Sequence, residues 1–218
     1  MAGIQDFQHY EDDFIGTVAT FPTSADPATP WLVDDTSSSG TPTYTTGTSV
    51  AVLTLASTEE VENVCLHHGD ALSFDIDLIQ SIEFSAKTVA ALDSATTIVM
   101  GLGSARNDDP DAVAANAFFK LAGSNAVVCE SDDGTTDNDD KATGVSLVAA
   151  YKRFFIDFTG GKSNVKFYID GERVASSTTF DMSGYSAGLQ PIFQIQKTSD
   201  TNTDSLTIDY VRVTCKRA

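Results

Sequence analysis

Residues 164–175 read NVKFYIDGERVA, and this stretch decides the fold. From Val165 to Ile169, apolar side chains alternate with polar ones, which is the period-two pattern of a strand with one buried face. Asp170-Gly171 follows, and these residue types reach positive φ at little cost, while residues 173–175 begin a return strand. The stretch therefore predicts a β-hairpin.

Similar apolar runs recur along the chain and are separated by Gly, Asp and Asn. Residues 59–66 are open to two interpretations, a short helical turn or an extended connection. No apolar stripe of 3.6-residue period is sustained, and strands do not alternate with helices. The pattern predicts an all-β, antiparallel sandwich of one domain. Further strands are expected at 49–55, 72–79, 82–89, 96–103, 118–122, 126–130, 153–158, 192–197 and 206–213.

The first 47 residues differ from the rest in being polar, acidic and rich in Thr, Ser and Pro. Proline removes a ladder donor, so this segment is expected to be an extended N-terminal arm or edge segment preceding a sandwich domain at 48–218. Trp31, the only tryptophan, either anchors the arm on the domain or contacts a partner. The candidate partner-binding residues are Phe14, Trp31, Leu32 and Tyr44.

The net charge of −18 is unevenly distributed. Residues 1–100 hold fifteen acids and a single base, Lys87, whereas residues 101–218 hold sixteen acids and twelve bases. Such a surface repels nucleic acid phosphates and anionic membranes, so neither is an expected partner. The acidic N-terminal half favours docking on a basic surface.

Three cysteines, Cys65, Cys129 and Cys215, are widely spaced and odd in number. This predicts buried free thiols rather than a disulfide framework or a CxxC metal site. The N-terminal residues show no secretory signal, and no run of eighteen apolar residues is present. We expect synthesis in a reducing cytoplasm.

Two stretches carry a family resemblance. Residues 154–158 followed by 165–175 resemble the strand and "FYxDG…VA" hairpin of concanavalin A-like (laminin-G-like) jelly rolls, and residues 205–213 resemble their last strand. The resemblance implies a jelly-roll β-sandwich whose last strand lies near the N-terminal strand. It implies less about activity, because this scaffold hosts lectins, hydrolases, adhesins and viral surface proteins.

The chain as a whole also resembles structural proteins of tailed bacteriophages. The matching features are the start Asp12-Asp13-Phe14-Ile15-Gly16-Thr17, the Thr- and Ser-rich arm and the acidic sandwich. This resemblance implies a homo-oligomeric capsid decoration (cement) protein that binds the major capsid protein and lies on the virion surface after synthesis in the host cytoplasm. The alternative is a receptor- or carbohydrate-binding module of a tail fibre or spike.

A glycosidase is the first enzyme class to test, because β-glucanases of this fold carry Glu-x-Asp-x-x-Glu on one strand. The nearest match here is Asp75-Ile76-Asp77-Leu78-Ile79-Gln80, with Asp75 and Asp77 on one strand face. Gln80 replaces the third carboxylate and cannot exchange a proton as a retaining mechanism requires. The sequence-based expectation is therefore that the protein is not an enzyme and has no catalytic residue.

The most acidic loop, residues 131–141, offers the hard oxygen ligands that Ca²⁺ prefers. It lacks EF-hand spacing and a closing glutamate, so a solvated loop with no cofactor is the competing interpretation. The candidate calcium ligands are Asp132, Asp133, Asp137 and Asp139.

Overall fold

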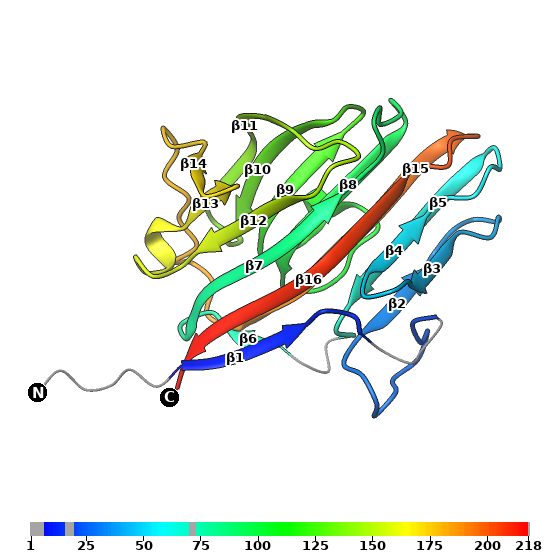
Figure 1. Ribbon diagram of the computed structural model, residues 1–218. Helices are drawn as coiled ribbons and strands as arrows, with labels where there is room; N and C mark the ends of the chain where they lie inside the picture. The colour runs from blue at the N-terminus through cyan, green and yellow to red at the C-terminus, as the bar shows by residue number, and fades with distance from the viewer. Residues whose placement is uncertain (1–6, 16–19, 70–72, 218) are drawn as a thin grey trace, which may run out of the picture.

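The computed structural model describes residues 7–15, 20–69 and 73–217, and they form two antiparallel sheets (Figure 1). Sheet I has the strand order β14 (Glu172–Val174), β13 (Lys166–Ile169), β12 (Lys152–Asp157), β7 (Ile79–Lys87), β16 (Ser205–Lys216), β4 (Ala51–Thr54) and β3 (Thr43–Thr46). Strand β1 (Phe7–Asp12) also pairs with the C-terminal half of β16.

Sheet II has the strand order β11 (Asp137–Ser146), β10 (Ala126–Asp132), β9 (Asn116–Ala122), β8 (Thr96–Gly103), β15 (Gly188–Asp200), β5 (Glu60–His67) and β2 (Leu32–Asp35). The two-residue β6 (Phe74–Asp75) pairs with the start of β15. The helical turns in the described chain are η1 (Pro110–Ala112) and η2 (Lys162–Asn164). Neither is long or apolar enough to cross a membrane.

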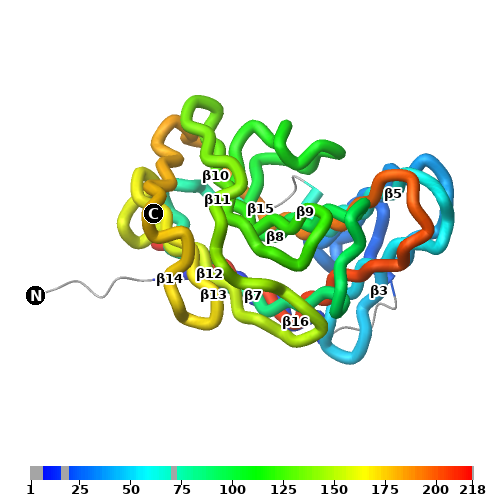
Figure 2. Tube along the Cα trace, turned by 90° about the horizontal axis from the view of Figure 1, so that it is seen from above, coloured from blue at the N-terminus to red at the C-terminus, as the bar shows by residue number. Residues whose placement is uncertain are grey.

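The two sheets stack as layers and bury their facing side chains (Figure 2). Phenylalanines join them: Phe84 and Phe154 of sheet I stack at a centroid distance of 5.2 Å, and Phe119 of sheet II lies 4.8 Å from Phe154. Phe193 meets Phe84 edge to face at 5.2 Å. Each pair adds about 0.5–1.5 kcal/mol beyond the apolar area it buries. The all-β jelly-roll prediction is confirmed.

The predicted hairpin is β13 and β14. Asp170 and Gly171 have φ of 52° and 87°, the two positive values that a tight two-residue turn with the correct twist requires. Phe167 faces Val174 across the hairpin, and both are buried. Period-two alternation therefore placed the correct side chains in the core.

The N-terminal segment is extended, and its described residues lie at the margins of both sheets. Strand β1 lies along β16, β2 is the last strand of sheet II and β3 the last strand of sheet I. Its prolines fit this placement because a marginal strand needs fewer ladder donors. The segment thus contributes strands to the sandwich as well as connections.

Two regions differ from the expectations. Residues 60–67 are neither a helical turn nor a connection, because they form strand β5 between β15 and β2. The acidic stretch 131–141 is only partly a loop, because β11 begins at Asp137 and pairs with β10. Charged residues suit β11, since it is an edge strand and charge discourages pairing with another chain.

Candidate functional site

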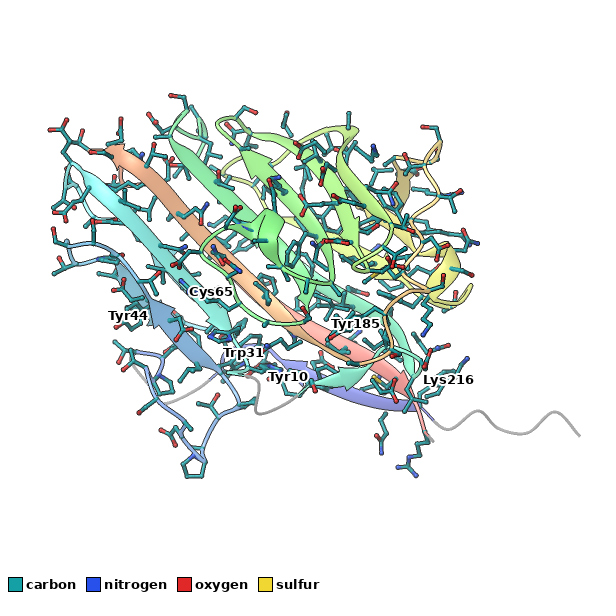
Figure 3. The ribbon with its side chains drawn as sticks, turned by 180° about the vertical axis from the view of Figure 1, so that it is seen from behind. Tyr10, Trp31, Tyr44, Cys65, Tyr185 and Lys216 are labelled. Carbon is teal, nitrogen blue, oxygen red and sulfur yellow. The ribbon has the colours of Figure 1, made fainter. Side chains whose placement is uncertain are left out.

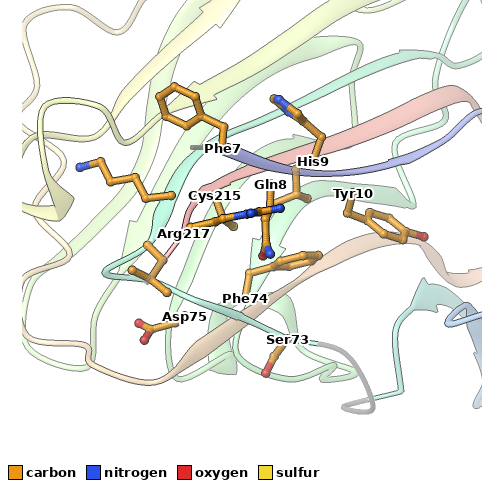
Figure 4. Close-up of a pocket in the computed structure, with 12 residues that line it drawn as sticks. Phe7, Gln8, His9, Tyr10, Ser73, Phe74, Asp75, Cys215 and Arg217 are labelled. Carbon is orange, nitrogen blue, oxygen red and sulfur yellow. The ribbon is translucent and has the colours of Figure 1, made fainter. Parts of the chain in front are cut away.

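A groove of about 940 Å³ lies between β1 of sheet I and β6 of sheet II (Figure 4). Its walls come from three parts of the chain that are far apart in sequence, brought together by the pairing of β1 with β16 and of β6 with β15. The lining residues are Phe7, Gln8, His9, Tyr10, Ser73, Phe74, Asp75, Leu78, Val213, Cys215, Lys216 and Arg217.

Strand alternation divides the side chains of β1 between two faces. Gln8 and Tyr10 stand opposite Cys215 and Val213 of β16, on the side that faces β6, whereas Phe7 and His9 point the other way (Figure 4). The Gln8 amide and the Tyr10 phenol therefore line one wall of the groove. Phe7, which is 39% exposed, lies at the rim with its ring turned away from β6 (Figure 4).

The closed end of the groove is aromatic. The Tyr10 ring lies 5.9 Å from that of Phe74, 5.1 Å from that of His68 and 6.4 Å from that of Trp31, measured between centroids. Trp31 Nε1 donates a 2.8 Å hydrogen bond to Asp12 Oδ2, which fixes the indole. Figure 3 shows Tyr10 and Trp31 close together, with Lys216 at the opposite end of β1.

The open part of the groove is polar. Asp75 is exposed, and its Oδ1 accepts a 2.9 Å hydrogen bond from the backbone of Asp77, which fixes the carboxylate. Burial and, to a smaller extent, the nearby Asp75 charge raise the pKa of Cys215 to about 11, so the thiol is protonated at neutral pH. Gly188 lies beneath this wall, where a Cβ atom would come within 2.4 Å of Ser73 Oγ.

A smaller hollow of about 370 Å³ lies beside the groove and shares Lys216 with it. Strand β6 ends at Asp75 and the chain turns, so Asp77 lines the smaller hollow instead of the groove. Asp77 Oδ1 lies 2.8 Å from Lys162 Nζ. The expectation that Asp75 and Asp77 share one strand face is therefore not met, because the turn separates them.

The outer face of sheet II is covered by the chain's own loop 104–115. Val113 of this loop packs with Phe118 and Ile192 of the sheet, and Asp108 accepts hydrogen bonds from Asn63 Nδ2 at 3.2 Å. Lys120 Nζ lies 2.6 Å from Asp111 Oδ1 of the loop. These contacts cover the part of the face around Phe118 and Ile192, and a hollow of about 200 Å³ remains beside Asp108.

One ionisable cluster lies under the edge of this loop. Lys120 Nζ is 3.1 Å from Glu130 Oε2 and 3.3 Å from Asp140 Oδ1. Burial raises the pKa of Glu130 to about 7, against the opposing effect of Lys120. Glu130 is 1% exposed, so the carboxyl is shielded from solvent.

The predicted partner-binding residues are divided between core and surface. Phe14 and Trp31 are buried, with rings 5.6 Å apart, whereas Leu32 and Tyr44 are half-buried. For Trp31 the structure shows the anchoring alternative. The prediction that this group binds a partner stays a prediction.

The candidate calcium ligands make other contacts. Asp133 accepts backbone hydrogen bonds from Thr135 and Thr136, and also from Gly184 at 2.6 Å. Those bonds hold the pKa of Asp133 below its ordinary value despite the opposing effect of burial. Asp132 faces Asp137 across the hairpin end. Within the described residues, no group of three or more His, Cys, Asp or Glu side chains is arranged to hold a metal ion.

Comparisons with known proteins bear on the fold. No family model matches the sequence, and no curated protein matches it. Solved structures do match: SCLam, a non-specific endo-β-1,3(4)-glucanase from family GH16, at TM-score 0.66 and 12% identity over 100% of this chain and 94% of that one. The Emp47p carbohydrate recognition domain matches at TM-score 0.63 and 13% identity over 96% of both chains. A pseudo β-1,3-glucanase and immunostimulatory antigen of Mycobacterium tuberculosis matches at TM-score 0.62 and 15% identity over 95% and 98%.

These similarities show that the fold is the concanavalin A-like jelly roll, as the hairpin resemblance implied. They also correct one expectation. The conclusion that the protein is not an enzyme is wrong in its basis, because a structure that matches the whole chain is an endo-glucanase. Residues 75–80 do not lie on one strand, because the chain turns between β6 and β7. The missing third carboxylate in that stretch therefore says nothing about whether the protein is an enzyme.

The groove was missed from sequence. The short segment 7–10 has no distinctive pattern, and Phe74-Asp75 was expected to lie inside a longer strand. Only the pairing of β1 with β16 brings these segments together.

Proposed function

We propose that this protein binds a carbohydrate chain in the groove between β1 and β6. The observation that carries the proposal is the composition of the groove: the half-buried rings of Tyr10 and Phe74, the Gln8 amide and the exposed Asp75 carboxylate line one hollow. Glycan-binding and glucan-degrading proteins that share the fold support the same ligand class.

The chemistry of a sugar suits this lining. A pyranose has an apolar face of C–H groups that packs on an aromatic ring, and the Phe74 ring supplies such a surface. Its hydroxyls donate and accept hydrogen bonds. The Gln8 amide offers two donors and an acceptor, and Asp75 offers acceptors. Small numbers of placed polar groups on an apolar floor are typical of ligand sites.

The alternative location, the outer face of sheet II, is occupied by loop 104–115. A ligand there would have to displace Val113 from its apolar contacts and Asp111 from Lys120. The groove needs no such displacement.

Hydrolysis is a separate question from binding. Asp75 is the one carboxylate among the described lining residues of the groove, whereas glycosidases generally use two. The test below therefore measures turnover together with binding. The finer hypothesis, that the protein lies on a phage virion and docks on the major capsid protein, stays a proposal that co-sedimentation with purified heads would test.

The experiment is a titration of neutral glycans, laminarin among them, into the wild type by calorimetry, with released reducing ends measured in parallel. Gln8→Ala and Phe74→Ala should each weaken binding about tenfold or more. Matched controls are Asn138→Ala, an amide on β11, and Tyr151→Ala, an exposed aromatic immediately before β12.

The controls should bind within twofold of the wild type. Thermal melts of all four variants show whether each is folded. Absence of binding to every neutral glycan tested, or equal weakening by groove and control variants, would overturn the proposal.

A further inference from the structure

The outer face of sheet I carries a cluster of cations on an acidic protein. Positions that alternate with the buried residues place six of the thirteen Lys and Arg residues there, beside only four acids. The bases are Lys87, Arg153, Lys166, Arg173, Arg212 and Lys216, and the acids are Glu11, Glu83, Asp157 and Asp209. The rest of the chain holds seven bases and twenty-seven acids, so this face is locally basic.

The excess cations gather at the hairpin end of the face. On the β1 side, Arg212 forms a two-point ion pair with Glu11, and Tyr210 donates a hydrogen bond to Glu83. On the hairpin side, Arg153, Lys166 and Arg173 form no ion pair within the described residues. The hairpin half thus carries three bases and one acid, Asp157, which faces Lys166 across β12 and β13, whereas the rest of the face carries three bases and three acids.

Two aromatic rings lie among these three cations. The registers place Arg173 beside Tyr168, Tyr168 beside Phe155, and Arg153 two residues from Phe155 on the same strand. The rings of Phe155 and Tyr168 meet edge to face at 5.9 Å, and both are half-buried on a solvent-facing surface. Lys166 lies two residues from Tyr168 on β13.

We propose that this aromatic–basic patch, formed by Arg153, Phe155, Lys166, Tyr168 and Arg173, is a second binding site, for a negatively charged polysaccharide. Guanidinium and ammonium groups recognise sulfate and carboxylate groups, and Arg does so with paired hydrogen bonds. The aromatic pair receives the apolar face of the sugar ring. The patch is separate from the groove, because β12, β13 and β14 lie beyond β7, whereas β1 pairs with the opposite edge of β16, and none of the five patch residues lines the groove.

The overall negative charge does not prevent this. At physiological salt, charges act over about 8 Å, so a ligand at the patch responds mainly to the local cations. Strands about 4.8 Å apart place the cations of β12 and β14 about two strand spacings from each other, with Lys166 on β13 between those strands.

The test uses dextran sulfate as the charged probe, neutral dextran as its uncharged match, and oligothymidylate as a polyanion whose charges are backbone phosphodiesters instead of sulfated pyranose rings. The patch variant is R153Q/K166Q/R173Q. The matched control is K87Q/K141Q/K162Q, which removes the same charge from lysines outside both the patch and the groove.

Dextran sulfate should bind the wild type, and the patch variant should bind it at least tenfold more weakly, with a reduced dependence of affinity on salt. The control variant should stay within threefold. Tyr168→Ala should weaken dextran sulfate binding with no change of charge. The groove variant Phe74→Ala should leave it unchanged, which separates this site from the proposed function.

Three results would overturn the assignment: no binding of dextran sulfate by the wild type, equal weakening by the two triple variants, or tighter binding of oligothymidylate with the same dependence on the patch. The last result would assign the patch to single-stranded nucleic acid.

Discussion

Lys197 offers the sharpest test of how the sandwich is held together, because its ammonium is fully buried. Nζ donates hydrogen bonds to the carbonyl oxygens of Ala56, Thr58 at 2.8 Å and Asn202 at 3.2 Å, and lies 3.7 Å from Glu62 Oε2. Both Lys197 and Glu62 are 0% exposed. One cation thus joins β15, β5 and two turns.

The substitution Lys197→Met keeps the shape and removes the charge. Three carbonyl oxygens lose their donor, at about 1 kcal/mol or more each, and Glu62 keeps only the donors Ala56 N and Thr58 Oγ1. Breaking a buried ion pair from one side costs about 3–5 kcal/mol. For a chain of this size, that lowers the Tm by roughly 6–20 °C.

The assay is urea unfolding of the wild type, Lys197→Met, Glu62→Gln and the double variant. The double variant should lose less free energy of unfolding than the two single variants together, because neither Lys197 nor Glu62 is then left as an unpaired buried charge. Lys141→Met, on the edge strand β11, serves as the control and should change the free energy of unfolding by less than about 0.5 kcal/mol. A loss below about 1 kcal/mol for Lys197→Met, or strictly additive losses, would refute the reasoning.

Three further predictions concern single positions. Gly101 has φ of 152°, and an added Cβ would lie 2.2 Å from the Ala117 carbonyl oxygen, so Gly101→Ala should cost about 3 kcal/mol or more, measured by urea unfolding. Burial raises the pKa of Glu130 from 4.5 to about 7. Between pH 4.5 and 7 the folded state therefore keeps a proton on Glu130, whereas the unfolded state has released it. The free energy of unfolding should therefore fall by up to about 3 kcal/mol as pH rises from 4.5 through 7, and Glu130→Gln should flatten the profile, with a parallel profile contradicting the assignment. Trp31→Phe removes the bond to Asp12 and should cost about 1–2 kcal/mol, and an unchanged melt would contradict it.

The hairpin could be predicted because its information is local. Alternation from Lys166 to Ile169 and the turn residues Asp170-Gly171 need no distant partner to be read. The same alternation places Lys166 and Tyr168 on the solvent face. It does not show that Arg153 and Phe155 lie beside them, because that depends on the register between β12 and β13.

The groove, unlike the hairpin, could not be predicted from local sequence. Gln8 and Cys215 face one another across β1 and β16, although 206 positions separate them. Neither segment has a pattern that names its partner. Strand β5 was ambiguous for a related reason: Glu62 and Asn63 are polar, and their burial makes sense only once Lys197 and Asp108 are in place.

The cover on sheet II explains why both proposed binding surfaces lie elsewhere on this molecule. Burying a side chain such as Val113, Phe118 or Ile192 contributes about 1.5–3 kcal/mol each, so exposing the three by lifting loop 104–115 costs roughly 5–9 kcal/mol. A glycan bound with a dissociation constant between millimolar and micromolar supplies about 4–8 kcal/mol in total. The loop therefore competes with any ligand for that face on nearly equal terms, before the Lys120–Asp111 contact is broken. Among the described residues, a ligand meets no such competitor in the groove or on the outer face of sheet I.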